Sequence, residues 1–293
     1  MSNRSILKTF LAAGLVAVSL NPGFAETLQA PGAKIYYEVR GSGPVLLMIP
    51  GGALDAGIFA ELSRQLSDKY TVVTYDPRGN SRSKLDGKPK DLLLDEQGED
   101  AALLIKTLSK EPAFVFGSSG GAQIGLNLAA RHPERVRLLV AHEPPTLMLL
   151  PDPSKELASD KDIHATYLRQ GAGAAMKKFM GTAGLDDAPP PPPPTPEAAE
   201  TSARINGNLD YFFGHGIMPL SEYVPDIATL RVGKPRVIVA IGEKSAGQIT
   251  YRTGQALAEK LGTKPVIFPG DHMGYAFDTV AFAEVLRQTL DSK

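Results

Sequence analysis

The chain has 293 residues, 43% of them hydrophobic and 22% charged, which fits one large α/β domain with insertions or two modest domains. Its formal net charge is −1, so the charge balance does not favour a nucleic acid as partner. The chain contains no cysteine, which excludes disulfides and a lipid-modified cysteine at a processed N-terminus.

Residues 1–25 have the features of an export signal. A positively charged start, an apolar run at residues 10–20 and small residues at Gly23 and Ala25 precede a predicted cut before Glu26. An uncleaved membrane anchor is the competing interpretation, but the apolar run is shorter than the ~20 residues that a span needs. We therefore expect a periplasmic or secreted bacterial protein whose mature part is not stably inserted in a membrane.

Strands and helices alternate on both sides of an irregular middle section. The predicted strands are residues 34–39, 45–49, 70–75, 113–116, 136–141, 236–241 and 265–268. The predicted helices are residues 56–67, 93–109, 122–131, 252–261 and 281–290. This alternation predicts an α/β fold with a mostly parallel, doubly wound sheet. Ligands of such sheets bind at the carboxyl ends of the strands.

The alternation breaks between residues 146 and 230, which separate a first core segment, residues 26–145, from a second, residues 231–293. We expect this section to be an inserted helical lid. Its proline run Pro189–Pro194 favours an extended segment, interpreted as a stiff connector, with a docking motif for a partner's aromatic groove as the alternative. Apolar residues of the lid and its surroundings are candidates for an apolar substrate pocket: Leu147, Met148, Phe179, Phe212 and Met273.

A G-x-S-x-G pattern centred on Ser119 lies between a predicted strand and a predicted helix. A serine on so tight a bend needs neighbours without Cβ, here Gly117 and Gly121, because strand and helix pass close to it on both sides. The helix N-terminus then offers free N–H groups where an oxyanion would form. We predict that Ser119 is a nucleophile; the alternative is a glycine-rich turn with two capping serines.

Four signals in this order resemble the α/β-hydrolase family over nearly all of the mature chain. They are Pro50-Gly51-Gly52, the loop Asp76-x-Arg78-Gly79-x-x-x-Ser83, the serine turn continuing into residues 128–136, and Gly270-x-His272. One departure is Asn80-Ser81, which stands where the family pattern usually has x-Gly. The resemblance implies a serine hydrolase with an esterase- or lipase-like site.

A serine hydroxyl needs a base, and the resemblance implies a histidine after the last strand, where His272 stands. The neighbouring Asp271 is expected to structure the loop. The remaining histidines have other expected places: His132 caps a helix, His142 points away from its neighbour Glu143, and His164 and His215 fall in the lid.

The resemblance also implies an acidic residue that pairs with the histidine. Here the sequence departs from the commonest family layout, because Ser245 stands where an Asp is expected. The alternative family position follows the strand at residues 136–141 and holds Glu143. We take Glu143 as the acid and Glu243 as second choice, leaving open a dyad or another acid. The acid would fix the imidazole tautomer and stabilise the imidazolium.

The expected oxyanion hole uses the backbone N–H of Gly120 and that of Gly52 or Ala53. The predicted reaction is attack on a small-molecule ester or lactone, formation of an acyl-enzyme on Ser119, and hydrolysis. No cofactor and no metal are expected. A serine at position 119 excludes a haloalkane dehalogenase. A perhydrolase or haloperoxidase-like activity, a lyase using the serine–histidine pair, and a non-catalytic binding protein remain as alternatives.

Overall fold

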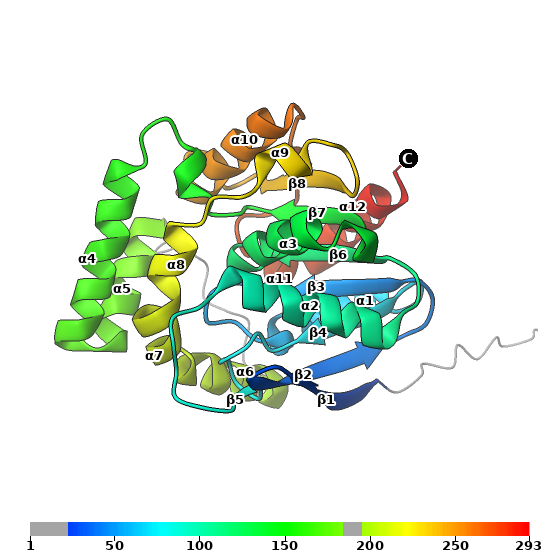
Figure 1. Ribbon diagram of the computed structural model, residues 1–293, viewed down its shortest axis with the longest axis horizontal. Helices are drawn as coiled ribbons and strands as arrows, with labels where there is room; N and C mark the ends of the chain where they lie inside the picture. The colour runs from blue at the N-terminus through cyan, green and yellow to red at the C-terminus, as the bar shows by residue number, and fades with distance from the viewer. Residues whose placement is uncertain (1–22, 184–194, 293) are drawn as a thin grey trace, which may run out of the picture.

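The computed structural model describes residues 23–183 and 195–292 (Figure 1). Nearly all of the predicted export signal and the whole Pro189–Pro194 run lie outside the described residues. Among the described residues, no helix is both long enough and apolar enough to cross a bilayer.

A mixed sheet forms the centre of the described structure. Its strands are β1 (Phe24–Ala30), β2 (Ala33–Arg40), β3 (Val45–Ile49), β4 (Thr71–Tyr75), β5 (Lys84–Leu85), β6 (Ala113–Ser118), β7 (Val136–His142), β8 (Arg236–Gly242) and β9 (Val266–Phe268). Their spatial order is β1-β2-β4-β3-β6-β7-β8-β9, with β5 beside β2. Six neighbouring strands run parallel: β4, β3, β6, β7, β8 and β9. The other three, β1, β2 and β5, form an antiparallel edge. The expected mostly parallel sheet is therefore present.

Helices cover both faces of this sheet. On one face lie a 3-10 turn η1 (Ala56–Phe59), α1 (Ala60–Leu66), α11 (Gly274–Phe277) and α12 (Thr279–Asp291). On the other lie α2 (Leu94–Leu108), α3 (Gly120–Arg131) and α10 (Ile249–Leu261). Every residue of β3 and β6 is buried, as the burial of both sheet faces requires. This layering brings the carboxyl ends of β3, β6, β7, β8 and β9 to one edge.

A cap of helices follows β7 and lies over that edge. It consists of η3 (Leu147–Leu149), α4 (Ser154–Gln170), α5 (Ala172–Ala183), α6 (Pro196–Gly207), α7 (Leu209–Tyr211), the π-helix η4 (Phe212–Gly216), α8 (Ile217–Ser221) and α9 (Ile227–Leu230). Helices α4, α5 and α8 lie together at one end of the molecule, at the left of Figure 1. A short 3-10 turn, η2 (Pro133–Arg135), precedes β7.

Some elements differ from the sequence expectations. Strands β1 and β5 and helix α11 were not expected, α3 begins at Gly120, and α10 begins at Ile249. Most of β1 is exposed, and its apolar residues do not alternate with polar ones, so the sequence shows no strand period here. The strand forms because it pairs with β2 through the tight turn at Gly32, whose φ is 76°. Since β1 begins at Phe24, the predicted cut before Glu26 falls inside this strand.

Candidate active site

Ser119 lies on the bend between β6 and α3, with φ 57° and ψ −128°. Its glycine neighbours have no room for a side chain. A Cβ on Gly117 would lie 2.4 Å from the Gly121 carbonyl oxygen, and one on Gly121 would lie 2.1 Å from the Ile49 carbonyl oxygen. The Ser119 N–H donates to the His142 carbonyl oxygen at 2.9 Å, which fixes the bend to β7. The glycine spacing thus has the steric cause that the sequence suggests.

The two backbone segments expected to form the oxyanion hole lie in contact. Gly52 has φ 55°, and a Cβ on Gly120 would lie 3.3 Å from the Gly52 nitrogen. As first residue of α3, Gly120 has an N–H without a partner inside that helix. The Asn80 amide donates to the carbonyl oxygens of Gly52 (3.0 Å) and Leu54 (2.9 Å) and so holds the loop after β3 in place.

A side chain of the cap braces the same loop. Asn208 donates to the Ala53 carbonyl oxygen (2.8 Å) and to Ser81 Oγ (2.8 Å), and it accepts from the Ser81 N–H (2.6 Å). Ser81 has φ 48°, a conformation that glycine adopts without strain. The family departure at this position is therefore compensated by Asn208, which satisfies the strained residue and ties it to the expected oxyanion loop.

Glu143 and His272 form a hydrogen-bonded pair. His272 Nδ1 lies 2.7 Å from Glu143 Oε2. The carboxylate is fully buried and also accepts from the Gly242 N–H (2.8 Å) and the Thr250 hydroxyl (2.9 Å). Glu143 stands just after β7 with φ 46°, so the strand pleat ends before it and its side chain turns toward His272. The imidazole is thereby held in one orientation, with Nε2 free of this contact.

Charge holds this carboxyl ionised. Burial alone raises the pKa of Glu143. The opposing effects are larger and lower this pKa to about 2: they come from the hydrogen bond and charge of His272, from His142 and from the Ser245 hydroxyl. Ser245 thus lies beside the carboxylate without replacing it. Glu243 is exposed and accepts from the Gly270 N–H at 3.4 Å instead.

His142 lies beneath His272. The two rings are stacked with centroids 6.3 Å apart, and His142 Nδ1 lies 3.1 Å from Ser118 Oγ. Phe116, Tyr275 and other aromatic rings surround it. Burial lowers the pKa of His142 to about 4, so it is neutral at pH 7. His142 is a buried core residue next to the candidate site. The sequence analysis expected only that it points away from Glu143.

The serine and the histidine are supplied by neighbouring parts of the same edge. Ser119 binds the main chain of His142, whose ring stacks on His272. Within the described residues no hydrogen bond joins Ser119 Oγ to His272. Such contacts are often long in a free enzyme and shorten when substrate binds.

The other polar candidates lie outside this cluster. Asp271 accepts from the Met273 N–H at 2.8 Å and so structures its loop. His132 follows α3 and donates its N–H to the Leu128 carbonyl oxygen. His164 contacts the Phe213 carbonyl oxygen at 2.7 Å, and His215 contacts Asp91 at 3.0 Å. In residues 23–183 and 195–292 we find no cluster of three metal-binding side chains.

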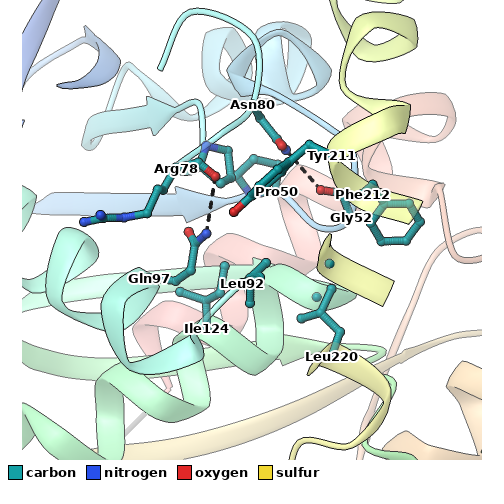
Figure 2. Close-up of a pocket in the computed structure, with 13 residues that line it drawn as sticks. Pro50, Gly52, Arg78, Asn80, Leu92, Gln97, Ile124, Tyr211, Phe212 and Leu220 are labelled. Carbon is teal, nitrogen blue, oxygen red and sulfur yellow. Dashed lines mark hydrogen bonds between the residues drawn. The ribbon is translucent and has the colours of Figure 1, made fainter. Parts of the chain in front are cut away.

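A small cavity begins at the expected oxyanion hole (Figure 2). Its wall includes Gly52, Gly120, Gln97 and Phe212, and the space open to the centre of a water molecule is about 20 Å³. Of the apolar candidates for substrate binding, Phe212 lines this cavity. The others do not line it: Leu147, Met148, Phe179 and Met273. Phe179 instead packs behind Phe212, with ring centroids 5.7 Å apart.

Comparison of the sequence with known proteins identifies the family of this chain. The chain is 36% identical over 271 residues to the uncharacterised hydrolase YraK of Bacillus subtilis, covering 91% of this chain and 96% of YraK. The family model described as alpha/beta hydrolase fold matches residues 44–181. The chain belongs to the α/β-hydrolase family.

Solved structures of other α/β-hydrolases share the fold at low identity. A thermophilic esterase from Thermogutta terrifontis has a TM-score of 0.70 and 17% identity, covering 92% of this chain and 98% of the esterase. The enol-lactonase from Burkholderia xenovorans has a TM-score of 0.71 and 17% identity, covering 91% of this chain and all of the lactonase (100%).

Three residues of this α/β-hydrolase site were not found from the sequence. Thr250 and Asn208 carry no local signal, because their partners lie more than one hundred positions away in the chain. Gln97 did carry one. It precedes Ala101 and Leu104 by four and seven positions, so it stands on the buried face of its helix as a polar residue among apolar ones.

Proposed function

We propose that this hydrolase cleaves a carboxylic ester or lactone through an acyl-enzyme on Ser119. The observation that carries the proposal is the 2.7 Å contact between His272 Nδ1 and the buried Glu143 carboxylate, at the strand edge where Ser119 stands. An imidazole oriented this way uses Nε2 as a base. The esterase and lactonase among its structural neighbours support this reaction class.

In the proposed reaction His272 Nε2 accepts the hydroxyl proton as Ser119 Oγ bonds to the carbonyl carbon. The resulting oxyanion accepts hydrogen bonds from the N–H groups of Gly52 and Gly120. The tetrahedral intermediate collapses when the bond to the leaving oxygen breaks and His272 returns the proton to that oxygen. Water then repeats the sequence on the acyl-enzyme, releasing the acid and free Ser119.

A fluorophosphonate probe tests the nucleophile directly. We expect labelling of the wild type, loss of labelling in Ser119→Ala, and retained labelling in Ser118→Ala, a matched control at the buried neighbour. Labelling that persists in Ser119→Ala contradicts the proposal. An absence of labelling in every variant supports a non-catalytic binding protein instead. Hydrolysis of a 4-nitrophenyl ester, lost with the label, separates hydrolysis from other uses of the serine–histidine pair.

We also propose that residues 1–25 direct export and are removed. The support is the charge and apolar pattern at the N-terminus. Cleavage before Glu26 leaves residues 26–30 of β1 to pair with β2. Cell fractionation followed by N-terminal sequencing tests this: we expect a periplasmic or secreted form that begins at Glu26, and a cytoplasmic form that begins at residue 1 contradicts it.

A further inference from the structure

The side-chain amide of Gln97 has a buried oxygen without a partner. Gln97 is 1% exposed and lines the cavity beside the expected oxyanion hole. Its Nε2 donates to the Arg78 carbonyl oxygen at 3.4 Å, a contact that Figure 2 shows, and this carbonyl determines which way the amide faces. Oε1 accepts no hydrogen bond from any described residue. A buried acceptor left in this state is costly. The amide oxygens of Gln123 and Asn127 are also buried without a partner, but of these three residues Gln97 is the one that lines the cavity, where a ligand group can reach it.

Of the other polar side chains in the cavity wall, Arg78 and Asn80 have partners already, and the third is the Tyr211 hydroxyl. Arg78 pairs with Asp100 (2.7 Å) and donates to the Pro31 carbonyl oxygen (2.9 Å). The Asn80 amide nitrogen is used by the loop after β3, as described above. The rest of the wall is largely apolar: Pro77, Leu92, Ile124, Phe212 and Leu220. Gln97 Oε1 is therefore an acceptor without a protein partner, on a residue that lines a small and largely apolar space.

Geometry decides which half of an ester reaches this space. The leaving oxygen must lie near His272, because His272 protonates it. The cavity starts at Gly52 and Gly120, which hold the carbonyl oxygen in the proposed reaction, and its wall includes neither His272 nor Ser119 itself. Gly120 directly follows Ser119, to which the acyl part becomes bonded in that reaction. The substituent directed into the cavity is therefore the one that stays on the carbonyl carbon, the acyl part.

Building on the proposed function, we propose that this cavity binds the acyl part of the substrate and that this part is short and carries a hydrogen-bond donor. The donor is a hydroxyl or amino group on the first or second carbon after the carbonyl, and it donates to Gln97 Oε1. The volume of about 20 Å³ limits the chain to a few heavy atoms. Gln97 is thus a specificity-determining residue rather than a catalytic one.

Two isosteric pairs of phenyl esters test the proposal. Phenyl glycolate is compared with phenyl propionate, and phenyl 3-hydroxypropanoate with phenyl butyrate, each rate being divided by its rate of alkaline hydrolysis. We expect the wild type to prefer the hydroxylated member of at least one pair by tenfold or more in corrected kcat/KM, as a rough figure. Phenyl octanoate, too long for the cavity, should be the poorest substrate.

Variants assign the preference to the amide. Gln97→Leu and Gln97→Met keep the bulk of the side chain and remove the acceptor, and we expect either to lower the corrected kcat/KM for a hydroxylated ester to that of its isostere, both measured on the same variant. Thr289→Val is the control, because Thr289 is also buried but lies in α12 and does not line the cavity. Its preference should equal that of the wild type. Should both Gln97 variants fail to fold, the wild-type ratios alone still decide.

The outcomes separate this inference from the proposed function. Esters cleaved by a labelled Ser119 with no preference within either pair, or with a preference unchanged in Gln97→Leu, overturn the inference and leave the proposed function standing. An indifferent wild type also indicates that water alone satisfies Gln97 Oε1. If no ester is cleaved and Ser119 takes no label, the proposed function itself fails.

Discussion

The two sides of the candidate site are fixed in different ways. On the acid side, Glu143 and His272 both follow core strands, and main-chain and side-chain donors hold the carboxylate at 2.7–2.9 Å. On the oxyanion side, the loop after β3 is held by Asn80 and by Asn208, which belongs to the cap. The core thus positions the candidate acid and base, whereas the cap braces the loop of the expected oxyanion hole and contributes Phe212 and Leu220 to the cavity wall. Substitutions on the two sides should therefore fail differently.

The largest effect is expected on the acid side. Glu143→Gln keeps the size of the side chain but removes the charge that orients and stabilises the His272 imidazolium, so kcat should fall by about 10³–10⁴. The matched control is Glu243→Gln, whose exposed side chain does not contact His272. We expect its kcat on the same ester to stay close to the wild-type value. Equal losses in the two variants would show that Glu143 is not the acid.

A smaller effect is expected where the cap meets the oxyanion loop. Asn208→Ala removes the donor to the Ala53 carbonyl oxygen and the bonds to Ser81, so the loop that carries Gly52 is held less firmly. We expect kcat to fall about tenfold with little change in KM, less than the roughly hundredfold or greater loss that follows removal of an oxyanion donor itself. Asn206→Ala, an exposed asparagine two positions before it, serves as control. Loss of stability with kcat intact contradicts a positioning role.

The acid side also predicts how stability depends on pH. The pKa of His142 is lowered from 6.5 to about 4 by burial, so folding disfavours its protonation and stability is lost as pH falls from 6.5 toward 4. The slope from this one proton is about 1.4 kcal/mol per pH unit at most. Glu143, with its pKa lowered from 4.5 to about 2, adds a further loss as pH falls from 4.5 toward 2.

His142→Gln isolates the histidine contribution. Its unfolding free energy, measured in urea between pH 7.5 and 4.5, should change less with pH than that of the wild type, because the glutamine does not titrate. Identical slopes would mean that His142 is protonated in the folded protein as readily as in the unfolded chain.

The core and the cap also differ in how much of the candidate site could be predicted from the sequence. The bend at Ser119 depends on glycines whose spacing is local, so its place could be predicted. Glu143 could be proposed because the family resemblance offers an acid position after the strand at residues 136–141, at the edge where the strand ends meet. Of the residues of the cavity wall, Phe212 was expected at an apolar pocket, whereas Gln97 was not, because only tertiary packing brings α2 beside Gly52. Asn208 was missed because a brace between distant segments leaves no periodic pattern.

The smallest effect is expected at Ser81 on the oxyanion side, where backbone strain and a hydrogen bond make opposite contributions to stability. Ser81→Gly relieves a strained φ of 48°, worth about 1 kcal/mol. It also removes the hydroxyl that accepts from Asn208, at a similar cost of about 1 kcal/mol. The net change in unfolding free energy should therefore be close to zero. Ser81→Ala loses the hydroxyl and keeps the strain, so it should be less stable than Ser81→Gly by about 1 kcal/mol. Chemical denaturation of both variants measures this difference. A more stable alanine variant would mean that the positive φ of residue 81 carries no strain.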